Sequence, residues 1–194
     1  MQHGFDPMIS KRFRTRTHSA RGFTLIEVMV VVVLVGILAT LALVAMRRWL
    51  ITSKSIEAMH VMEGIRGGEE RFRSENMVYL DVSTSGTLYP TTAPNRTKYN
   101  WVQTGHTDYT RWRLLNPTVS TSVQHGYMVR AGRALTAPTA AMTPGVTVTW
   151  PTAANVNDAW YVIYAQGDLD ADGTYGRYAA SSFSSEVVRV NDGE

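Results

Sequence analysis

The feature that most constrains this sequence is an unbroken apolar run near its N-terminus. Residues 28–46, VMVVVVLVGILATLALVAM, include no charged side chain. As a helix rising about 1.5 Å per residue, these 19 residues extend about 28 Å, close to the roughly 30 Å hydrocarbon core of a bilayer. We therefore expect one transmembrane helix here.

The charges around this run predict its orientation. Five basic side chains precede it within residues 1–22, against the single acid Asp6, whereas Arg47 and Arg48 follow it. The positive-inside rule then places the N-terminus in the cytoplasm and exports the C-terminal part. The whole chain has a net charge of +3 and residues 1–22 have a net charge of +4, so the rest of the chain has a net charge of −1. We therefore expect no nucleic-acid binding by the folded part. The absence of cysteine excludes disulfides and thiolate metal sites.

Two other membrane segments share this outline. A cleaved secretory signal has an apolar region of about 7 to 15 residues before a small-x-small site, but this run is longer and ends without an Ala-x-Ala triplet. A permanent signal anchor stays open as the alternative. The chain would then be a non-assembling, membrane-anchored periplasmic binding module, calcium-dependent if the acidic loop described below holds that ion.

An acid, Glu27, stands at the cytoplasmic edge of the apolar run. A carboxylate among apolar neighbours is costly unless it is paired with a positive charge. It follows Arg21-Gly22-Phe23-Thr24-Leu25-Ile26, and the stretch from Arg21 to Glu27 together with the aliphatic run resembles the prepilin signature of type IV pilins and of type II secretion pseudopilins.

The resemblance implies a processing site and a set of partners. A prepilin peptidase would cut after Gly22, leaving Phe23 as a methylated N-terminal residue. Other pilin or pseudopilin subunits and an inner-membrane assembly platform would follow as partners, with Phe23, Thr24 and Glu27 as assembly residues. In such a filament Glu27 neutralises the N-terminal ammonium of a neighbouring subunit. Many family members carry a proline in the middle of the apolar helix, where this chain has Val44, so we expect no proline kink.

Beyond Arg48 the pattern becomes amphipathic and continues to about Asn76. One apolar stripe follows helical spacing, with Glu69 in line: Ala58, Met62, Ile65, Glu69 and Phe72, widened by Ile56 and Met59. We therefore expect four segments: a cleaved leader (1–22), a transmembrane and assembly helix (23–46), an amphipathic helix (47–76) and an exported β-rich head (77–194).

The head contains short runs with strand-like composition between loops rich in Thr, Ser, Pro and Gly. The runs are RWRLL (111–115), GYMVRA (126–131), VTVTW (146–150), WYVIYA (160–165) and SEVVRV (185–190). They predict an antiparallel sheet of about four strands, one face of which the amphipathic helix would cover. The expected fold is α+β and pilin-like, with a long N-terminal helix packed on a small antiparallel sheet.

An acidic loop near the C-terminus is a candidate calcium site. Asp168, Asp170 and Asp172 alternate before Gly173, like the first half of a D-x-D-x-D-G calcium loop, and the carbonyl of Thr174 is a further candidate ligand. The twelfth position is Ala179 rather than a bidentate Glu, which excludes a complete EF-hand. The same residues also suit the turn of a β-hairpin, and both interpretations can hold together.

No recognisable catalytic constellation appears in the sequence. H-E-x-x-H, G-x-S-x-G and P-loop motifs are absent, so we do not expect an enzyme. Glu57 and His60 form one Glu-x-x-His pair, but a di-iron bundle needs two such pairs and further glutamates. The aromatic residues suit the core of a small sheet better than an adhesive surface. The sequence therefore predicts a structural subunit, and the missing cysteine pair favours a minor pilin or a pseudopilin.

Overall fold

The computed structural model describes residues 22–119 and 122–192. The chain divides into two compact units, residues 1–42 and 43–194. The boundary lies within the long helix α1 (Leu25–Asn76), which contributes residues to both units. Each unit is described by itself below.

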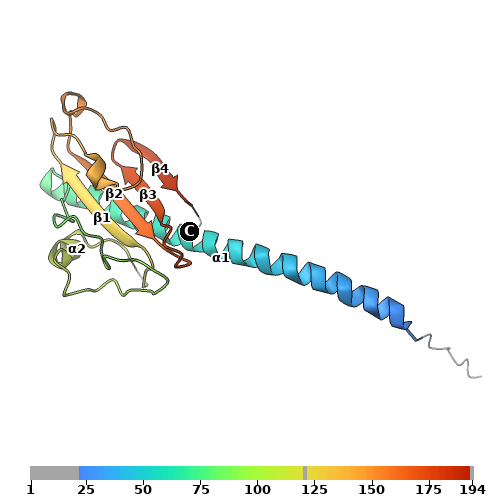
Figure 1. Cartoon of the computed structure of the whole chain (residues 1–194). Helices are drawn as coiled ribbons and strands as arrows, with labels where there is room; N and C mark the ends of the chain where they lie inside the picture. Colours follow the sequence, from blue (N-terminus) through green and yellow to red (C-terminus); the bar gives the residue numbers. More distant parts are fainter. Residues whose placement is uncertain (1–21, 120–121, 193–194) are drawn as a thin grey trace, which may run out of the picture. The chain divides into compact units, whose positions relative to one another are not determined.

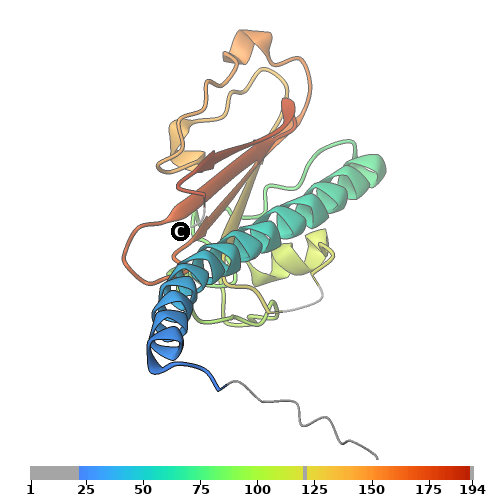
Figure 2. The same ribbon diagram turned by 90° about the vertical axis from the view of Figure 1, so that its right-hand side faces the viewer.

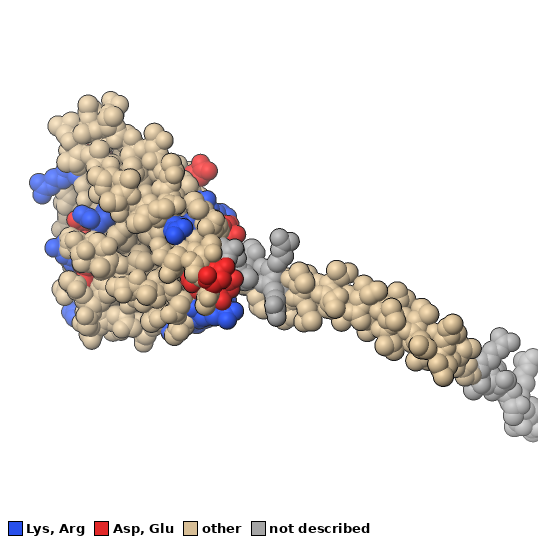
Figure 3. Space-filling model, viewed as in Figure 1, with Lys and Arg blue, Asp and Glu red and all other residues tan. Residues whose placement is uncertain are grey.

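The described part of the first unit is an exposed apolar helix. Every side chain from residue 22 to residue 42 is exposed, and the face seen in Figure 3 carries neither basic nor acidic colour. Within the described residues, one stretch, Leu25–Met46, is long and apolar enough to cross a membrane, with a mean hydropathy of 3.1.

The second unit is built on a four-stranded antiparallel sheet with strand order β1-β2-β3-β4 (Figure 1). Neighbouring strands follow one another along the chain, and Val129 of β1 faces Ile163 of β2 in the register. The bounds are β1 Gly126–Gly132, β2 Trp160–Gly167, β3 Gly176–Ser181 and β4 Ser184–Val190. A register shift interrupts the β3–β4 pairing between Ala179 and Ser181.

The part of α1 in this unit lies along one face of the sheet (Figure 2). Its apolar stripe packs against alternate residues of the strands, because side chains in a strand point to opposite faces in turn. The helix contributes Ala58, Val61, Met62 and Ile65, and the sheet Tyr127, Val129, Tyr161, Ile163, Ala165, Tyr178 and Ala180. Ile56, expected in this stripe, is instead 57% exposed, because Ser55 occupies the buried position one residue earlier.

Two glycines of α1 allow close contact with a second, short helix, α2 (Tyr109–Leu115), and the chain after it. A Cβ on Gly68 would lie 3.2 Å from the Leu115 side chain, and one on Gly64 would lie 3.0 Å from the Thr118 carbonyl oxygen. Gly67, between them, meets nothing within 4 Å. Glycine is a weak helix former, and at positions 64 and 68 close packing explains why a glycine is present in spite of that.

The β1–β2 connection covers the opposite face of the sheet. Val146 and Val148 pack with Met128 and Tyr164, and Val156 packs with Trp160 and Val162. Strand β2 is consequently buried on both faces, which explains its continuous apolar sequence.

Two of the expected strands are wrong. Residues 111–115 belong to α2, where Trp112 and Leu115, three residues apart, are buried while Arg111 and Arg113 are exposed. Residues 146–150 alternate in burial as a strand would, yet no described strand pairs with them. Both neighbouring positions of β2 are already filled by β1 and β3, so this segment lies over the sheet instead of joining it.

The fold class is confirmed. The chain has an apolar N-terminal helix, a further α-helix and an antiparallel sheet, and the C-terminal part of α1 packs on that sheet in an α+β, pilin-like arrangement.

Candidate functional site

The first candidate site is the start of the first unit, around the expected cleavage position. Gly22 and Phe23 precede the helix, which begins at Leu25, and the Phe23 side chain is 81% exposed. A Cβ on Gly22 would meet nothing within 4 Å, so the fold of the described residues imposes no need for glycine here. The glycine at position 22 is therefore compatible with the predicted role as the cleavage site, which does not depend on packing within this chain.

Thr24 and Glu27 cap the helix reciprocally. The Glu27 amide donates to Thr24 Oγ1 at 3.2 Å, and the Thr24 amide donates to Glu27 Oε2 at 3.5 Å. This is the capping box that Thr-x-x-Glu favours, since it satisfies amides that the first helical turn leaves without partners. The assembly role predicted for Thr24 and Glu27 does not include this cap, although the Thr-x-x-Glu spacing signals it.

The cap leaves most of the carboxylate of Glu27 available. A 3.5 Å contact to a neutral amide is long, and Oε1 of Glu27 has no hydrogen bond among the described residues. Glu27 is exposed in the chain as described, and no charged side chain follows it as far as Met46. A positive group can therefore reach this carboxylate and would displace at most the long hydrogen bond from the Thr24 amide.

The second candidate site is the loop between β2 and β3, residues 168–175. The strands on either side pair from Gly167 opposite Gly176, which confirms the hairpin. One carboxylate oxygen from each of Asp168, Asp170 and Asp172 lies within 4.8 Å of the others. The three carboxylates therefore come together as the calcium hypothesis requires, on a turn that the hairpin also needs.

Backbone amides already satisfy part of this acidic cluster. Asp168, which is 7% exposed, accepts hydrogen bonds from the amides of Ala171 at 2.7 Å and Gly173 at 3.2 Å. The Thr174 amide donates to Asp172 at 2.6 Å. Ala179, at the position of the missing EF-hand glutamate, is buried in β3. Oxygen ligands of this kind suit a hard cation such as calcium, and binding itself stays a prediction.

The second unit, residues 43–194, is called the head from here on, and it contains two glutamates of α1 with partners inside the fold: the half-buried Glu57 and the buried Glu69. Glu57 accepts a hydrogen bond from the Gln124 amide at 2.8 Å and lies 3.5 Å from Nδ1 of the buried His125. Burial raises the pKa of Glu57, but the hydrogen bonds from His125 and Gln124 outweigh it and lower the pKa overall. His60, the other member of the Glu-x-x-His pair, is exposed, whereas Glu57 contacts His125.

Glu69 is fully buried near the end of α1. Its Oε2 accepts a hydrogen bond from the Leu80 amide at 2.9 Å, and its Oε1 has no partner among the described residues. Burial raises the pKa of Glu69 to about 8; the Leu80 amide opposes this, and the nearby charges of Glu70 and Asp81 add to it. Glu69 is thus a structural acid of the core rather than a surface group.

Comparison with known proteins bears on the first site. The model of the prokaryotic N-terminal methylation motif matches residues 17–43, which include Gly22, Phe23 and Glu27. The chain carries a prepilin-type N-terminal signature. Searches of curated proteins and of solved structures found no match.

The prepilin-type signature supports a pilin-like or pseudopilin-like precursor. It suggests a structural subunit rather than an enzyme, and it implies processing by prepilin peptidase and association with other pilin-type subunits. Together with the apolar stretch Leu25–Met46, it fits anchoring in a membrane. The match covers residues 17–43 only, so it says nothing about the head.

Proposed function

We propose that the protein is a pilin-like structural subunit that is cleaved after Gly22 and assembled through its N-terminal helix into a type IV pilus or a type II secretion pseudopilus. A minor pilin or a pseudopilin fits best, since the chain has no cysteine pair. The observation that carries the proposal is the prepilin-type signature on an exposed apolar helix in which Glu27 is the sole charged residue from 22 to 46.

Electrostatics explains why assembly would use Glu27. Cleavage creates an ammonium at Phe23, and both this charge and the carboxylate are costly in an apolar bundle of helices unless they pair. Removing one member of a buried ion pair costs roughly 3 to 5 kcal/mol, because the other charge is left alone. An intermolecular pair would therefore fix the axial register between subunits.

The capping box supports a second candidate function. Because Thr24 and Glu27 already satisfy each other within one chain, Glu27 has a local use that needs no neighbouring subunit. The protein would then be a non-assembling, signal-anchored periplasmic module. The two functions differ in whether the wild-type protein enters the sheared filament fraction, which only an assembling subunit does.

The substitution Glu27→Gln tests whether assembly uses the charge. A glutamine retains an oxygen that can accept the Thr24 amide hydrogen bond but has no negative charge. If subunits pair through this charge, Glu27→Gln and Glu27→Ala both insert into the membrane at normal levels and disappear from the sheared filament fraction. Glu75→Gln, an exposed acid on the same helix, is the matched control and should assemble normally.

Normal incorporation of Glu27→Gln into sheared filaments would contradict pairing through the charge. Loss of Glu27→Ala alone would then assign the residue to helix capping.

A further inference from the structure

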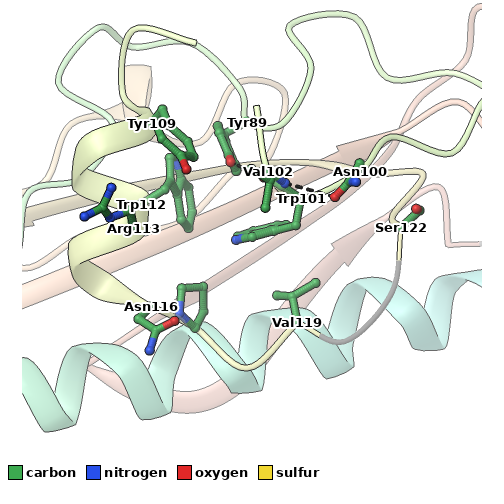
Figure 4. A pocket seen from close by; sticks show the side chains of 11 residues that line it. Tyr89, Asn100, Trp101, Val102, Tyr109, Trp112, Arg113, Asn116, Val119 and Ser122 are labelled. Atoms are coloured by element: carbon green, nitrogen blue, oxygen red, sulfur yellow. Dashed lines mark hydrogen bonds between the residues drawn. The ribbon is translucent and has the colours of Figure 1, made fainter. Parts of the chain in front are cut away.

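The head contains an aromatic hollow that neither the signature nor the filament role uses. It has a volume of about 640 Å³, within the roughly 300 to 1,000 Å³ of typical small-molecule pockets. It lies beside α2 (Figure 4), and aromatic and polar side chains share its wall: Tyr89, Trp101, Tyr109, Asn100, Arg113 and Asn116. All of these residues belong to the second unit.

The aromatic wall is held rigid by the core behind it. The Trp101 ring lies 5.1 Å from Tyr89 and 5.3 Å from Trp112, both edge to face, and Tyr89 stacks on Trp112 at 5.1 Å. Tyr89 and Trp112 are fully buried, whereas Trp101 and Tyr109 are only half-buried. The hollow therefore presents a preorganised indole and phenol surface, which reduces the ordering entropy that a ligand must overcome.

The polar groups at the rim are few and of defined chemistry. Asn100, Arg113 and Asn116 are exposed, and Arg113 is the single charged residue of the lining. No hydrogen bond or ion pair joins the Arg113 guanidinium to another residue in the described part of the chain. By contrast, the guanidinium groups of Arg71 and Arg111 on the adjoining surface donate to backbone carbonyls.

We propose that this hollow binds a glycan unit that carries a carboxylate, a hexuronate. The C–H face of a pyranose ring is apolar and can stack on the indole of Trp101, whose ring face is electron-rich. Amide side chains such as Asn100 and Asn116 both donate to and accept from sugar hydroxyls. The free guanidinium of Arg113 offers two parallel hydrogen bonds to one carboxylate.

Charge favours this ligand over a nucleic acid. Single-stranded nucleic acids also bind aromatic surfaces, but along basic grooves that follow many phosphates. Among the described residues that line the hollow, Arg113 alone is charged, and the chain after residue 22 has a net charge of −1. A ligand that places one carboxylate at the site matches the single positive charge of the lining. A nucleic acid, with a phosphate at every nucleotide, would need more positive charge than the lining provides.

Calorimetric titration of the full chain, in a detergent without a sugar headgroup, tests the proposal. The probes are short oligomers of galacturonate, glucuronate and mannuronate, cellobiose as the neutral sugar, and a thymidine oligonucleotide. We expect at least one hexuronate oligomer to bind, with cellobiose at least tenfold weaker. Arg113→Gln should weaken that binding by about ten- to a hundredfold, the usual weight of a charged hydrogen bond.

Arg111→Gln is the matched control, because Arg111 lies on the same helix but outside this hollow. It should change the affinity by less than twofold. Trp101→Ala should abolish binding; its melting temperature shows whether it folds, and if it does not, Arg113→Gln alone decides.

Four results would overturn the proposal: no binding of any hexuronate oligomer, equal affinity for cellobiose, equal losses from Arg111→Gln and Arg113→Gln, or binding of the oligonucleotide alone.

Discussion

At the scale of single residues, three glutamates of α1 show how surroundings decide the role of one carboxylate. Glu27 is exposed and caps its own helix, and Glu57 is anchored by His125 and the Gln124 amide. Glu69 is buried with one oxygen unpartnered. Burial without sufficient partners disfavours the charged form, so Glu69 is the acid whose ionisation opposes folding.

The raised pKa of Glu69 predicts a pH dependence of stability. The folded head holds this proton up to about pH 8, whereas the unfolded chain releases it near the ordinary value of 4.5. The contribution of protonated Glu69 to the free energy of unfolding is therefore complete below pH 4.5. It falls by at most about 1.4 kcal/mol per pH unit between pH 4.5 and about pH 8, and it is lost above that. Glu69→Gln cannot ionise, so it should flatten this part of the curve of unfolding free energy against pH.

Denaturant unfolding from pH 4.5 to pH 8.5 measures this effect. The slope is the decisive quantity, because the buried amide that Glu69→Gln introduces changes the absolute stability by its own unpaired hydrogens. Glu63→Gln, an exposed acid on the same helix, should keep the wild-type slope. An unchanged slope in Glu69→Gln would show that Glu69 is ionised in the folded head.

At the scale of elements, α1 accepts weak helix formers where a neighbour approaches. Gly64 and Gly68 touch the chain around Leu115 and Thr118, whereas Gly67 faces open space on the same helix. Substituting alanine at Gly67 and at Gly64 therefore compares the gain in helix propensity with the cost of a steric contact.

Gly67→Ala should stabilise the head by about 1 kcal/mol, the difference between glycine and alanine in a helix interior. That corresponds to a rise of about 2–4 °C in melting temperature for a domain of this size. Gly64→Ala should lose this gain, because its Cβ would lie 3.0 Å from a backbone oxygen that cannot rotate away. Equal melting temperatures for the two variants would contradict the close packing of α1 against the chain after α2.

The β2–β3 hairpin carries the calcium prediction. If the loop binds calcium, the ion stabilises the folded head and the melting temperature rises with its concentration and falls with a chelator. Asp170→Ala should abolish that response, and Glu186→Gln, an exposed acid on β4, should retain it. Asp168 is unsuitable for the test, because its carboxylate also holds the turn through two amides. A melting temperature that ignores calcium in the wild type would leave the loop as a hairpin turn only.

At the scale of the whole molecule, the proposed function depends on removal of residues 1–22. These residues carry a net charge of +4 and, Gly22 excepted, lie outside the described part of the chain. Once removed, they leave a polypeptide with a net charge of −1 and an ammonium beside Glu27.

Gly22→Leu should block cleavage in cells that contain a prepilin peptidase, since a branched side chain replaces a hydrogen atom at the expected cut. The unprocessed protein would be 22 residues longer than the mature form, a difference visible by electrophoresis. Mass spectrometry of the wild-type protein should find methylated Phe23 at its N-terminus. A wild-type chain that still begins at Met1 would exclude processing at Gly22.

The sequence by itself determined the features that depend on neighbouring residues. Hydropathy fixed the membrane-length helix, the spacing from Gly22 to Glu27 carried the signature, and the acidic stretch before Gly173 predicted the hairpin turn. These features depend on composition and on contacts a few residues apart, which a linear pattern records directly.

The features that depend on contacts between distant residues could be determined only from the tertiary structure, because a local sequence pattern does not show which distant segments meet. Residues 111–115 lie in a helix, which buries Trp112 and Leu115 in the core. Residues 146–150 do not form a strand next to β2, because β2 already pairs with β1 and β3. The buried Glu69 and the aromatic hollow that Arg113 lines owe their chemistry to chain segments that meet only after folding. Burial, rather than residue type, sets what such groups can do.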